Sequence, residues 1–395
     1  MYKSRVAILK TNPDTVTQDY ARLLELANCA GCLDPDAETL LKINISWQHF
    51  FPGCSTTPWQ LDGVIQALLE SGFGRDQLSA CHNRTVVVSA KKGEVENAHL
   101  PVVKQHDIRN VHLYEEKEEW VHIESAIGDV MDRLLALNKI YPDGFHIPRR
   151  LIGANIIQLP TVKTHVFTTI TGAMKNAFGG LLNEKRHWAH EAIHEALVDL
   201  LMIQQKIHPG LFAVMDGTFA GDGPGPRCME PQIKNVILAS ADQVAIDAVA
   251  ARLMGFDPLE DIKFIRIAHE LGLGCGDTSE IEIVGDTEAA RENWHFQGPY
   301  RNMTFAARMQ HAIYWGPLRS LLHWTLKSPL AFWSYLASIF YHDFYWYPLI
   351  GRPRVAEMLQ TEWGKLFQKY RNRWGDGNCR ESGNPCAGAT SSASH

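Results

Sequence analysis

Apolar residues recur along the chain in short runs, and longer amphipathic segments separate these runs. The short runs, rich in Val, Ile and Leu, predict β-strands at residues 6–9, 39–45, 85–89, 111–114, 152–159, 211–215, 236–239 and 281–284. The amphipathic segments predict helices at residues 19–30, 58–71, 184–207 and 243–254. Because strands and helices alternate, we expect an α/β fold with a mostly parallel sheet flanked by helices.

Capping residues mark the ends of two of the predicted helices. Thr57 is a favoured N-cap and Pro58 a favoured first helical residue, and Gly72 suits the end of the same helix. Asp242 can cap the start of the last predicted helix, and Gly255 can end it.

The hydrophobic pattern changes after residue 286. Trp, Tyr and Phe crowd residues 314–347, but the longest apolar stretch there is shorter than the ~20 residues that span a bilayer. This segment can pack on the α/β part as a helical subdomain, close over a site as a lid, or lie on a membrane surface. We favour the first reading, in which no large apolar patch stays exposed and peripheral membrane contact is not expected.

These changes divide the chain into three predicted parts. An α/β domain covers residues 1–286, and an aromatic helical extension covers residues 287–375. The extension closes with an amphipathic helix at residues 355–374. Residues 376–395 are rich in Gly, Ser and Asn, which predicts a disordered tail.

Composition and charge narrow the function classes. A net charge of −6 without a basic run does not favour nucleic-acid binding. The N-terminus lacks the pattern of a signal peptide, so we expect a cytoplasmic protein. The eight scattered cysteines favour free thiols. Cys29 and Cys32 form a lone CxxC pair, which is either a redox or metal site or an incidental spacing.

The stretch 159–180 carries the strongest candidate chemistry. Its polar residues directly follow the predicted strand 152–159, at the sheet edge where open α/β folds bind ligands. Lys163 and Lys175 are candidates for holding an anion, and His165 is a candidate acid or base. A loop with solvated lysines and capping threonines would explain the same pattern.

A short helix is predicted inside this stretch. Thr171 can cap its start, and Gly172 lets a ligand approach the backbone. A helix N-terminus beside lysines suits a carboxylate or a phosphate. Asn176, on the same helix, can donate an orienting hydrogen bond to such a ligand.

Polar residues near an earlier strand add to the candidate site. Lys42 and Asn44 share the polar face of strand 39–45, which is either solvated or directed into a site. Thr56 lies in the loop that leads into the next helix, so this loop is a second possible anion cradle.

A carboxylate and two glycines follow the strand at residues 211–215. Asp216 can orient a histidine or a lysine, bind a metal, or cap its own loop. Gly223 and Gly225 belong to a Gly- and Pro-rich loop, whose prolines favour a fixed backbone close to a ligand over simple flexibility.

Three histidines fall on one side of the predicted helix 184–207. His187, His190 and His194 have spacings at which histidines can share a metal, and a polar helix flank is the alternative reading. We keep His187 and His190 as site candidates because they are close in sequence to Lys175.

Several short motifs occur in a fixed order between residues 42 and 285. They are Lys42-Ile43-Asn44, the loop 52–58, Lys163-Thr164-His165, residues 171–176, Asp216-Gly217, residues 223–226, and residues 239–247 with Gly255. Together they resemble the bacterial and archaeal family known as domain of unknown function 362. The resemblance implies no agreed activity. Some relatives are fused to a ferredoxin-type iron–sulfur module, which implies redox chemistry in part of the family, but this chain lacks the dense four-cysteine run of such a module.

We therefore hypothesise an enzyme that acts on a small anionic substrate. The catalytic candidates are His165, Lys175 and Asp216, with His165 as acid or base and Asp216 positioning His165 or a metal. The substrate-binding candidates are Lys42, Asn44, Thr56, Lys163, Thr171, Gly172, Asn176, His190, Gly223 and Gly225. A redox protein served by a separate iron–sulfur protein partner and a non-catalytic ligand-binding protein remain open. No nucleotide-binding motif follows a strand, so the sequence names no cofactor.

Overall fold

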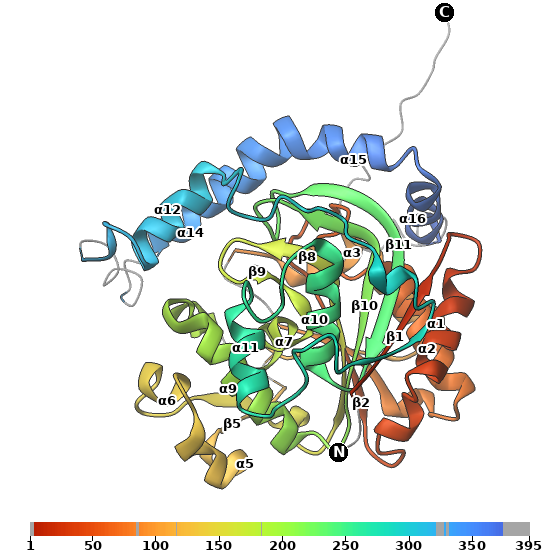
Figure 1. The fold of residues 1–395 in the computed structure, drawn as a ribbon, viewed down its shortest axis with the longest axis horizontal. Helices are drawn as coiled ribbons and strands as arrows, with labels where there is room; N and C mark the ends of the chain where they lie inside the picture. The colour runs from red at the N-terminus through yellow and green to blue at the C-terminus, as the bar shows by residue number, and fades with distance from the viewer. Residues whose placement is uncertain are drawn as a thin grey trace, which may run out of the picture.

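A ten-stranded mixed sheet forms the centre of the molecule (Figure 1). The computed structural model describes residues 4–373 apart from 84–86, 116, 183, 321–327 and 329–331. The strand order is β12-β1-β11-β10-β7-β2-β3-β4, with β8 paired to β10 and β9 paired to β8. These strands are β1 (Arg5–Lys10), β2 (Thr39–Ile43), β3 (Leu78–His82), β4 (Arg109–His112), β7 (Asn155–Leu159), β8 (Thr161–His165), β9 (Thr169–Ile170), β10 (Leu211–Asp222), β11 (Glu230–Ser240) and β12 (Glu282–Gly285). A second, two-stranded sheet pairs β5 (Trp120–His122) with β6 (His146–Pro148).

The sheet is largely parallel, which confirms the predicted α/β class. Strands β10, β7, β2, β3 and β4 pair in parallel, whereas β11 is antiparallel to both β10 and β1. Every residue of β2, β3 and β7 is buried, as expected for parallel strands covered on both faces.

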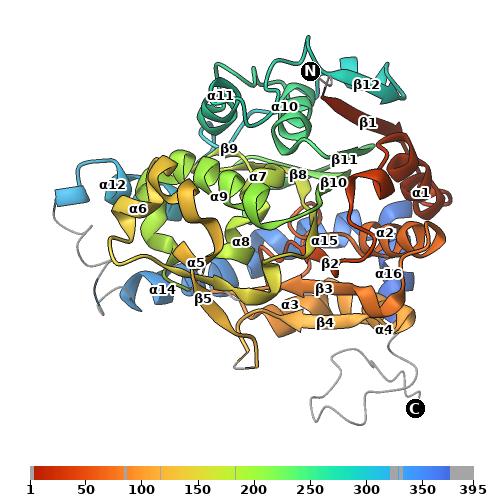
Figure 2. The same cartoon turned by 90° about the horizontal axis from the view of Figure 1, so that it is seen from below.

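Helices cover both faces of the sheet (Figure 2). On one face lie α1 (Val16–Leu26), α2 (Pro58–Glu70), α4 (His99–His106) and α16 (Glu362–Asn372). On the other lie α7 (Gly172–Asn176), α9 (Ile193–Ile207), α10 (Gln243–Met254) and α11 (Lys263–Glu270). Successive residues of β2 point to opposite faces of the sheet. Leu40 packs with the helices around α9, and Leu41 packs with those around α2. The shorter helices are α3 (Ala90–Glu96), α5 (Glu124–Ile127), α6 (Leu137–Ile140) and α8 (Phe178–Leu181).

The predicted caps of α2 and α10 are confirmed, whereas the cap predicted at Thr171 is wrong, because its side chain makes no capping hydrogen bond at the start of α7. The Thr57 side chain accepts from the Gln60 amide at the start of α2, in a reciprocal capping box. The Asp242 carboxylate accepts from the first amides of α10, and Gly255 ends that helix with φ +102°.

Three predicted elements of the α/β domain differ from the structure. The strand expected at 85–89 falls partly outside the described residues, and the chain instead forms β3 just before it. The helix expected at 184–207 is a 3-10 segment, Glu184–Ala192, followed by α9. The loop expected after residue 215 is the second half of β10, which continues to Asp222. The strand continues because the residues from Asp216 on pair with β8 or β11 or lie at a bulge in that pairing.

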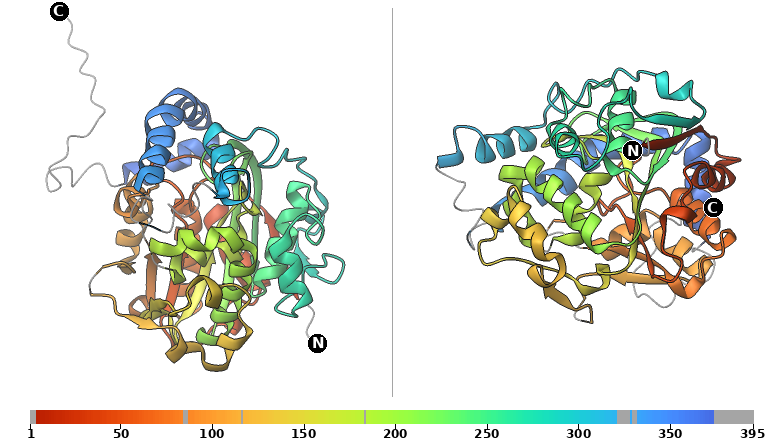
Figure 3. Two further views of the ribbon diagram at one scale, coloured as in Figure 1. Left: turned by 90° about the vertical axis from the view of Figure 1, so that its left-hand side faces the viewer. Right: turned by 60° about the horizontal axis from the view of Figure 1, so that its bottom comes forward.

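The aromatic extension runs along one end of the sheet (Figures 1 and 3). It contains α12 (Phe305–Tyr314), α14 (Phe332–Ile339), a π-helical segment (Phe340–Gly351) and α15 (Arg352–Met358). The helix predicted at 355–374 is broken, since Thr361 caps a separate helix, α16. That helix buries Trp363, Phe367 and Tyr370 in the α/β core. The tail predicted at 376–395 lies outside the described residues.

The extension exposes more apolar surface than the sequence led us to expect. Phe332, Leu336, Phe340 and Phe344 are 63%, 50%, 69% and 70% exposed. Their spacing of four residues places them along one side of the helical segment, and the Phe340 and Phe344 rings stack on each other. The expectation that residues 314–347 would leave no large apolar patch is therefore wrong.

Candidate functional site

A cavity of about 710 Å³ lies between the carboxyl ends of β2, β3 and β8 and the aromatic extension. Its inner wall comes from these strands, from α7 and from the 3-10 segment Glu184–Ala192. Its outer wall comes from α12, α14 and the π-helical segment. The cavity brings together eight of the predicted site residues, namely Lys42, Asn44, His165, Thr171, Lys175, Asn176, His187 and His190.

The wall of the cavity is rich in positively charged side chains. Four cationic side chains line it, from Lys42, Lys175, Arg186 and Arg227, and no Asp or Glu is found among the described residues of the wall. The outer wall is apolar and aromatic, with side chains such as Phe305, Trp333 and Tyr341. Clustered charge of one sign attracts the opposite sign, and the aromatic wall leaves room for an apolar body.

Among the described residues, no group forms a hydrogen bond with the Lys175 side chain in the cavity. The Asp247 carboxylate accepts from the Ala173 and Met174 amides and fixes the start of α7. The Lys175 ammonium then lies 5.5 Å from the centroid of the Phe178 ring, and no hydrogen-bond acceptor reaches it within the described part of the chain. Burial lowers the pKa of Lys175 to about 7, and the charges of Lys163 and Arg186 add to this effect.

Gly172 makes the tight start of α7 possible. Its φ of +71° is strained for any residue with a side chain, and a Cβ there would overlap the Asp247 carboxylate. The glycine thus allows the backbone to approach Asp247, rather than a ligand.

Two histidines of the cavity are neutral and present opposite hydrogen-bonding groups. The Phe167 amide donates to Nδ1 of His165 at 3.1 Å, so the ring carries its proton on Nε2. Nδ1 of His190 faces the His187 carbonyl at 3.0 Å, so its proton is on Nδ1. Burial is the main cause that lowers both pKa values, that of His165 well below its usual range and that of His190 to about 3.

An amide network joins the first strand of the site to α7. The Asn44 amide donates to Asn176 Oδ1 at 3.2 Å, and the Asn176 amide donates to the Lys42 carbonyl at 2.9 Å. Lys42 donates to the Ile43 carbonyl at 2.7 Å. Burial lowers the pKa of Lys42 to about 8, Cys81 opposes this shift, and Arg186 adds to it. The network fixes the directions of both asparagines before any ligand binds.

Comparison with known proteins agrees with the motifs. Residues 39–252, more than half of the chain, match the family model described as Domain of unknown function (DUF362). The chain belongs to the DUF362 family. The family resemblance expected from the sequence is therefore confirmed. A stretch of 121 residues is 31% identical to the thylakoid-associated protein sll1697 of Synechocystis sp., and it covers 30% of this chain and 37% of that protein. No solved structure matches the chain.

None of the helices in the described part of this DUF362 protein has the length and hydrophobicity needed to cross a bilayer.

Four motif residues of the DUF362 protein stand behind the cavity wall. Lys163 donates to Asn44 Oδ1 at 2.8 Å, to the Cys54 carbonyl at 2.6 Å and to Thr161 Oγ1 at 2.9 Å, so all three of its protons are used. The Thr56 hydroxyl accepts from the backbone N–H of Asn44 and donates to the Leu159 carbonyl. The Gly223 carbonyl accepts from the Thr164 hydroxyl, and Gly225 packs against the Thr164 carbonyl. These residues position the strand ends that carry the cavity residues.

The structure places Asp216 away from His165. Asp216 is fully buried within β10, and its Oδ2 accepts from Tyr20, Thr57 and Trp59 at 2.7, 2.8 and 3.0 Å. It therefore ties the sheet to α1 and α2. The expected role in positioning His165 was based on a loop that is in fact a strand.

Arg186 and Arg227 were not among the sequence candidates. Arg227 directly follows the Gly- and Pro-rich turn, and Nη1 of its guanidinium is buried with no hydrogen-bond partner among the described residues. The Thr171 hydroxyl is also buried and has no hydrogen-bond partner among the described residues. A cation directly after a rigid turn is the signal that could have identified Arg227.

Proposed function

We propose that this DUF362 protein binds a small anion with an apolar body in the cavity and acts on it by acid–base chemistry. One observation carries the proposal: within the described residues, four cationic side chains and no carboxylate line the cavity, and no group forms a hydrogen bond with the Lys175 ammonium. Like charges in a partly buried site destabilise one another. A bound carboxylate or phosphate would offset that repulsion, while the aromatic outer wall would cover its apolar part.

Of the two predicted catalytic residues that line the cavity, Lys175 is the better proton carrier. A pKa of about 7 lets its amine gain and lose a proton near neutral pH, which is the property of an efficient general acid or base. His165 stays neutral and can donate from Nε2 to an oxygen of the substrate. Asn44 and Asn176 would orient the substrate, and Lys42 and Arg227 would hold its charge.

Ligand-dependent melting separates an anion site from a merely apolar cavity. Octanoate and octyl phosphate should raise the melting temperature, whereas octanol, which has the same chain without the charge, should have little effect. A ligand at a hundredfold excess over Kd stabilises the folded state by about 2.7 kcal/mol. For a chain of this length that corresponds to a shift of about 3 °C.

The Lys175→Met variant should lose most of the octanoate shift. The matched control is Lys206→Met, because Lys206 is exposed and pairs with Asp129 at 3.3 Å on the surface. Equal shifts with octanoate and octanol, or a full octanoate shift in Lys175→Met, would contradict the proposal.

Turnover decides whether the bound anion is a substrate. A non-catalytic binding protein would keep the octanoate shift but convert no carboxylate or phosphate ester. Three further expectations stay predictions: a cytoplasmic location, no contact with nucleic acid, and electron transfer from an iron–sulfur partner. The anion-binding proposal depends on none of them.

A further inference from the structure

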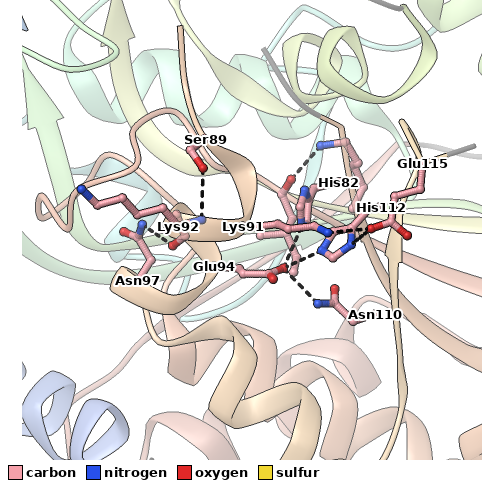
Figure 4. Close-up of polar contacts among 12 residues, drawn as sticks. His82, Ser89, Lys91, Lys92, Glu94, Asn97, Asn110, His112 and Glu115 are labelled. Carbon is pink, nitrogen blue, oxygen red and sulfur yellow. Dashed lines mark hydrogen bonds and ion pairs between the residues drawn. The ribbon is translucent and has the colours of Figure 1, made fainter. Parts of the chain in front are cut away.

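Two histidines and a glutamate meet at the carboxyl ends of β3 and β4. His82 and His112 end these neighbouring parallel strands and are direct partners in the strand register. Their rings lie 4.8 Å apart, and Glu94 of α3 points between them (Figure 4). One ligand atom from each of the three residues lies within 4.8 Å of the other two. The residues come from three separate elements, so the sequence spacing alone could not reveal the cluster.

Both histidines direct the same nitrogen at the same oxygen. Nε2 of His82 is 2.9 Å and Nε2 of His112 is 3.0 Å from Glu94 Oε2. Two ligand atoms that each lie about 2.0–2.1 Å from a metal ion stand about 3 Å apart when the angle between them is near 90°. The two nitrogen–oxygen separations therefore suit metal coordination as well as hydrogen bonding.

A second carboxylate fixes the orientation of His112. Its Nδ1 lies 3.0 Å from Glu115 Oε1, and Glu115 in turn pairs with Lys91 at 3.0 Å. A neutral imidazole has only one N–H, so both nitrogens of His112 cannot donate to carboxylates at once. If Nδ1 donates to Glu115, the lone pair of Nε2 faces Glu94, and either a second proton on His112 or a metal ion must lie between them. Carboxylate–histidine–metal chains have this arrangement.

We propose that His82, Glu94 and His112 bind one divalent transition-metal ion, zinc(II) or iron(II). Two histidines and one carboxylate are a ligand set of both metals, and they leave coordination positions open. Asn110 donates to Glu94 Oε2 at 2.9 Å and so orients the carboxylate. His82 also lines the cavity, so the metal site borders the wall of the anion site. The proposal does not depend on the function proposed for Lys175.

Cobalt(II) is a suitable probe because its visible absorption reports ligand geometry. The full-length protein, stripped with a chelator, should bind one equivalent of cobalt(II), give a visible spectrum, and release the cobalt to zinc(II). Zinc(II) alone should raise the melting temperature. Glu94→Gln, which keeps the shape of the side chain, and His112→Ala should each weaken binding at least a hundredfold. Glu115→Gln should weaken it 10–100-fold, as expected for a residue that only orients a ligand.

Two controls make the result specific. His122 and His146 form another pair of accessible histidines, with rings 5.3 Å apart. The His122→Ala variant removes one of them and should leave the cobalt spectrum unchanged. Lys175→Met should also leave it unchanged, while Glu94→Gln should keep the octanoate shift, so the two proposals fail independently. A folded wild-type protein that binds no cobalt(II) or zinc(II) overturns the metal site, and so does equal binding by wild type, Glu94→Gln and His112→Ala. Either outcome would mean that a proton on His112 bridges the two carboxylates instead.

Discussion

Replacing Lys175 by methionine should make the protein without ligand more stable. The ammonium is desolvated in the cavity and has no hydrogen bond among the described residues, so the folded state disfavours its charge. Its pKa falls from 10.5 to about 7, and each unit corresponds to about 1.4 kcal/mol, which sets an upper bound of about 5 kcal/mol. Methionine has a similar length, favours helices and carries no charge.

Water in the cavity reduces this upper bound. Because the side chain is partly exposed to the cavity, we expect about 2 kcal/mol, which corresponds to a rise of roughly 2–3 °C in melting temperature for a chain of this length. The folded pKa lies below the unfolded one. The penalty is therefore complete below pH 7, decreases as the pH rises from 7 to about 10.5, and vanishes above that. The melting temperatures of wild type and Lys175→Met should differ most at pH 6 and converge at alkaline pH.

Lys163→Met is the matched control and should have the opposite sign. Lys163 is also buried and burial lowers its pKa to about 8, but its three protons all have acceptors. Its loss leaves buried oxygens unpaired, so we expect a destabilisation of about 2–4 kcal/mol. Thermal melts between pH 6 and 10 in the absence of anions test both variants. If Lys175→Met melts at or below the wild-type temperature at pH 6 while staying folded, the view of Lys175 as a stability-limiting cation is wrong.

Two further predictions concern the frame of the site. Gly172→Ala should lower the free energy of unfolding by several kcal/mol, because the new Cβ would sit at a positive φ and overlap the Asp247 carboxylate. Denaturant unfolding measures this loss. A variant as stable as wild type would contradict the described start of α7. Ending the chain at Asp286 should cause aggregation, because it removes the α16 residues Trp363 and Phe367 from the core. Light scattering measures the aggregation. A monomeric, equally stable fragment would show that the α/β part folds alone.

Local signals predicted the elements with distinct boundaries. Helix α10 begins and ends where Asp242 and Gly255 predict it, because capping depends on residues that are adjacent in the chain. The alternation at residues 39–45 predicted a strand with Lys42 and Asn44 on one face, and β2 covers Thr39–Ile43 of that range with both faces buried. The same reasoning placed Asp216 wrongly, because a strand with several glycines has the composition of a loop.

The sequence left open whether the aromatic extension covers the site, and the structure shows that it forms the outer wall of the cavity. Its residues, from Phe305 to Tyr341, lie more than a hundred positions from Lys175 and Arg186, and no local pattern indicates which sheet edge an aromatic helix will cover. The histidine–glutamate cluster was missed for a related reason. It depends on the register between β3 and β4, and β3 was not predicted.

The place of β1 in the sheet has a consequence for how the chain is made. β1 is synthesised first, yet its two neighbours are β11, where Ala7 pairs with Ala239, and β12, where Val6 pairs with Ile283. Pairing of residues so distant in sequence closes a long loop and slows folding. During translation both edges of β1 therefore stay open until most of the chain has left the ribosome. An apolar strand with two open edges is a binding site for chaperones, so β1 needs protection while the rest of the sheet is being synthesised.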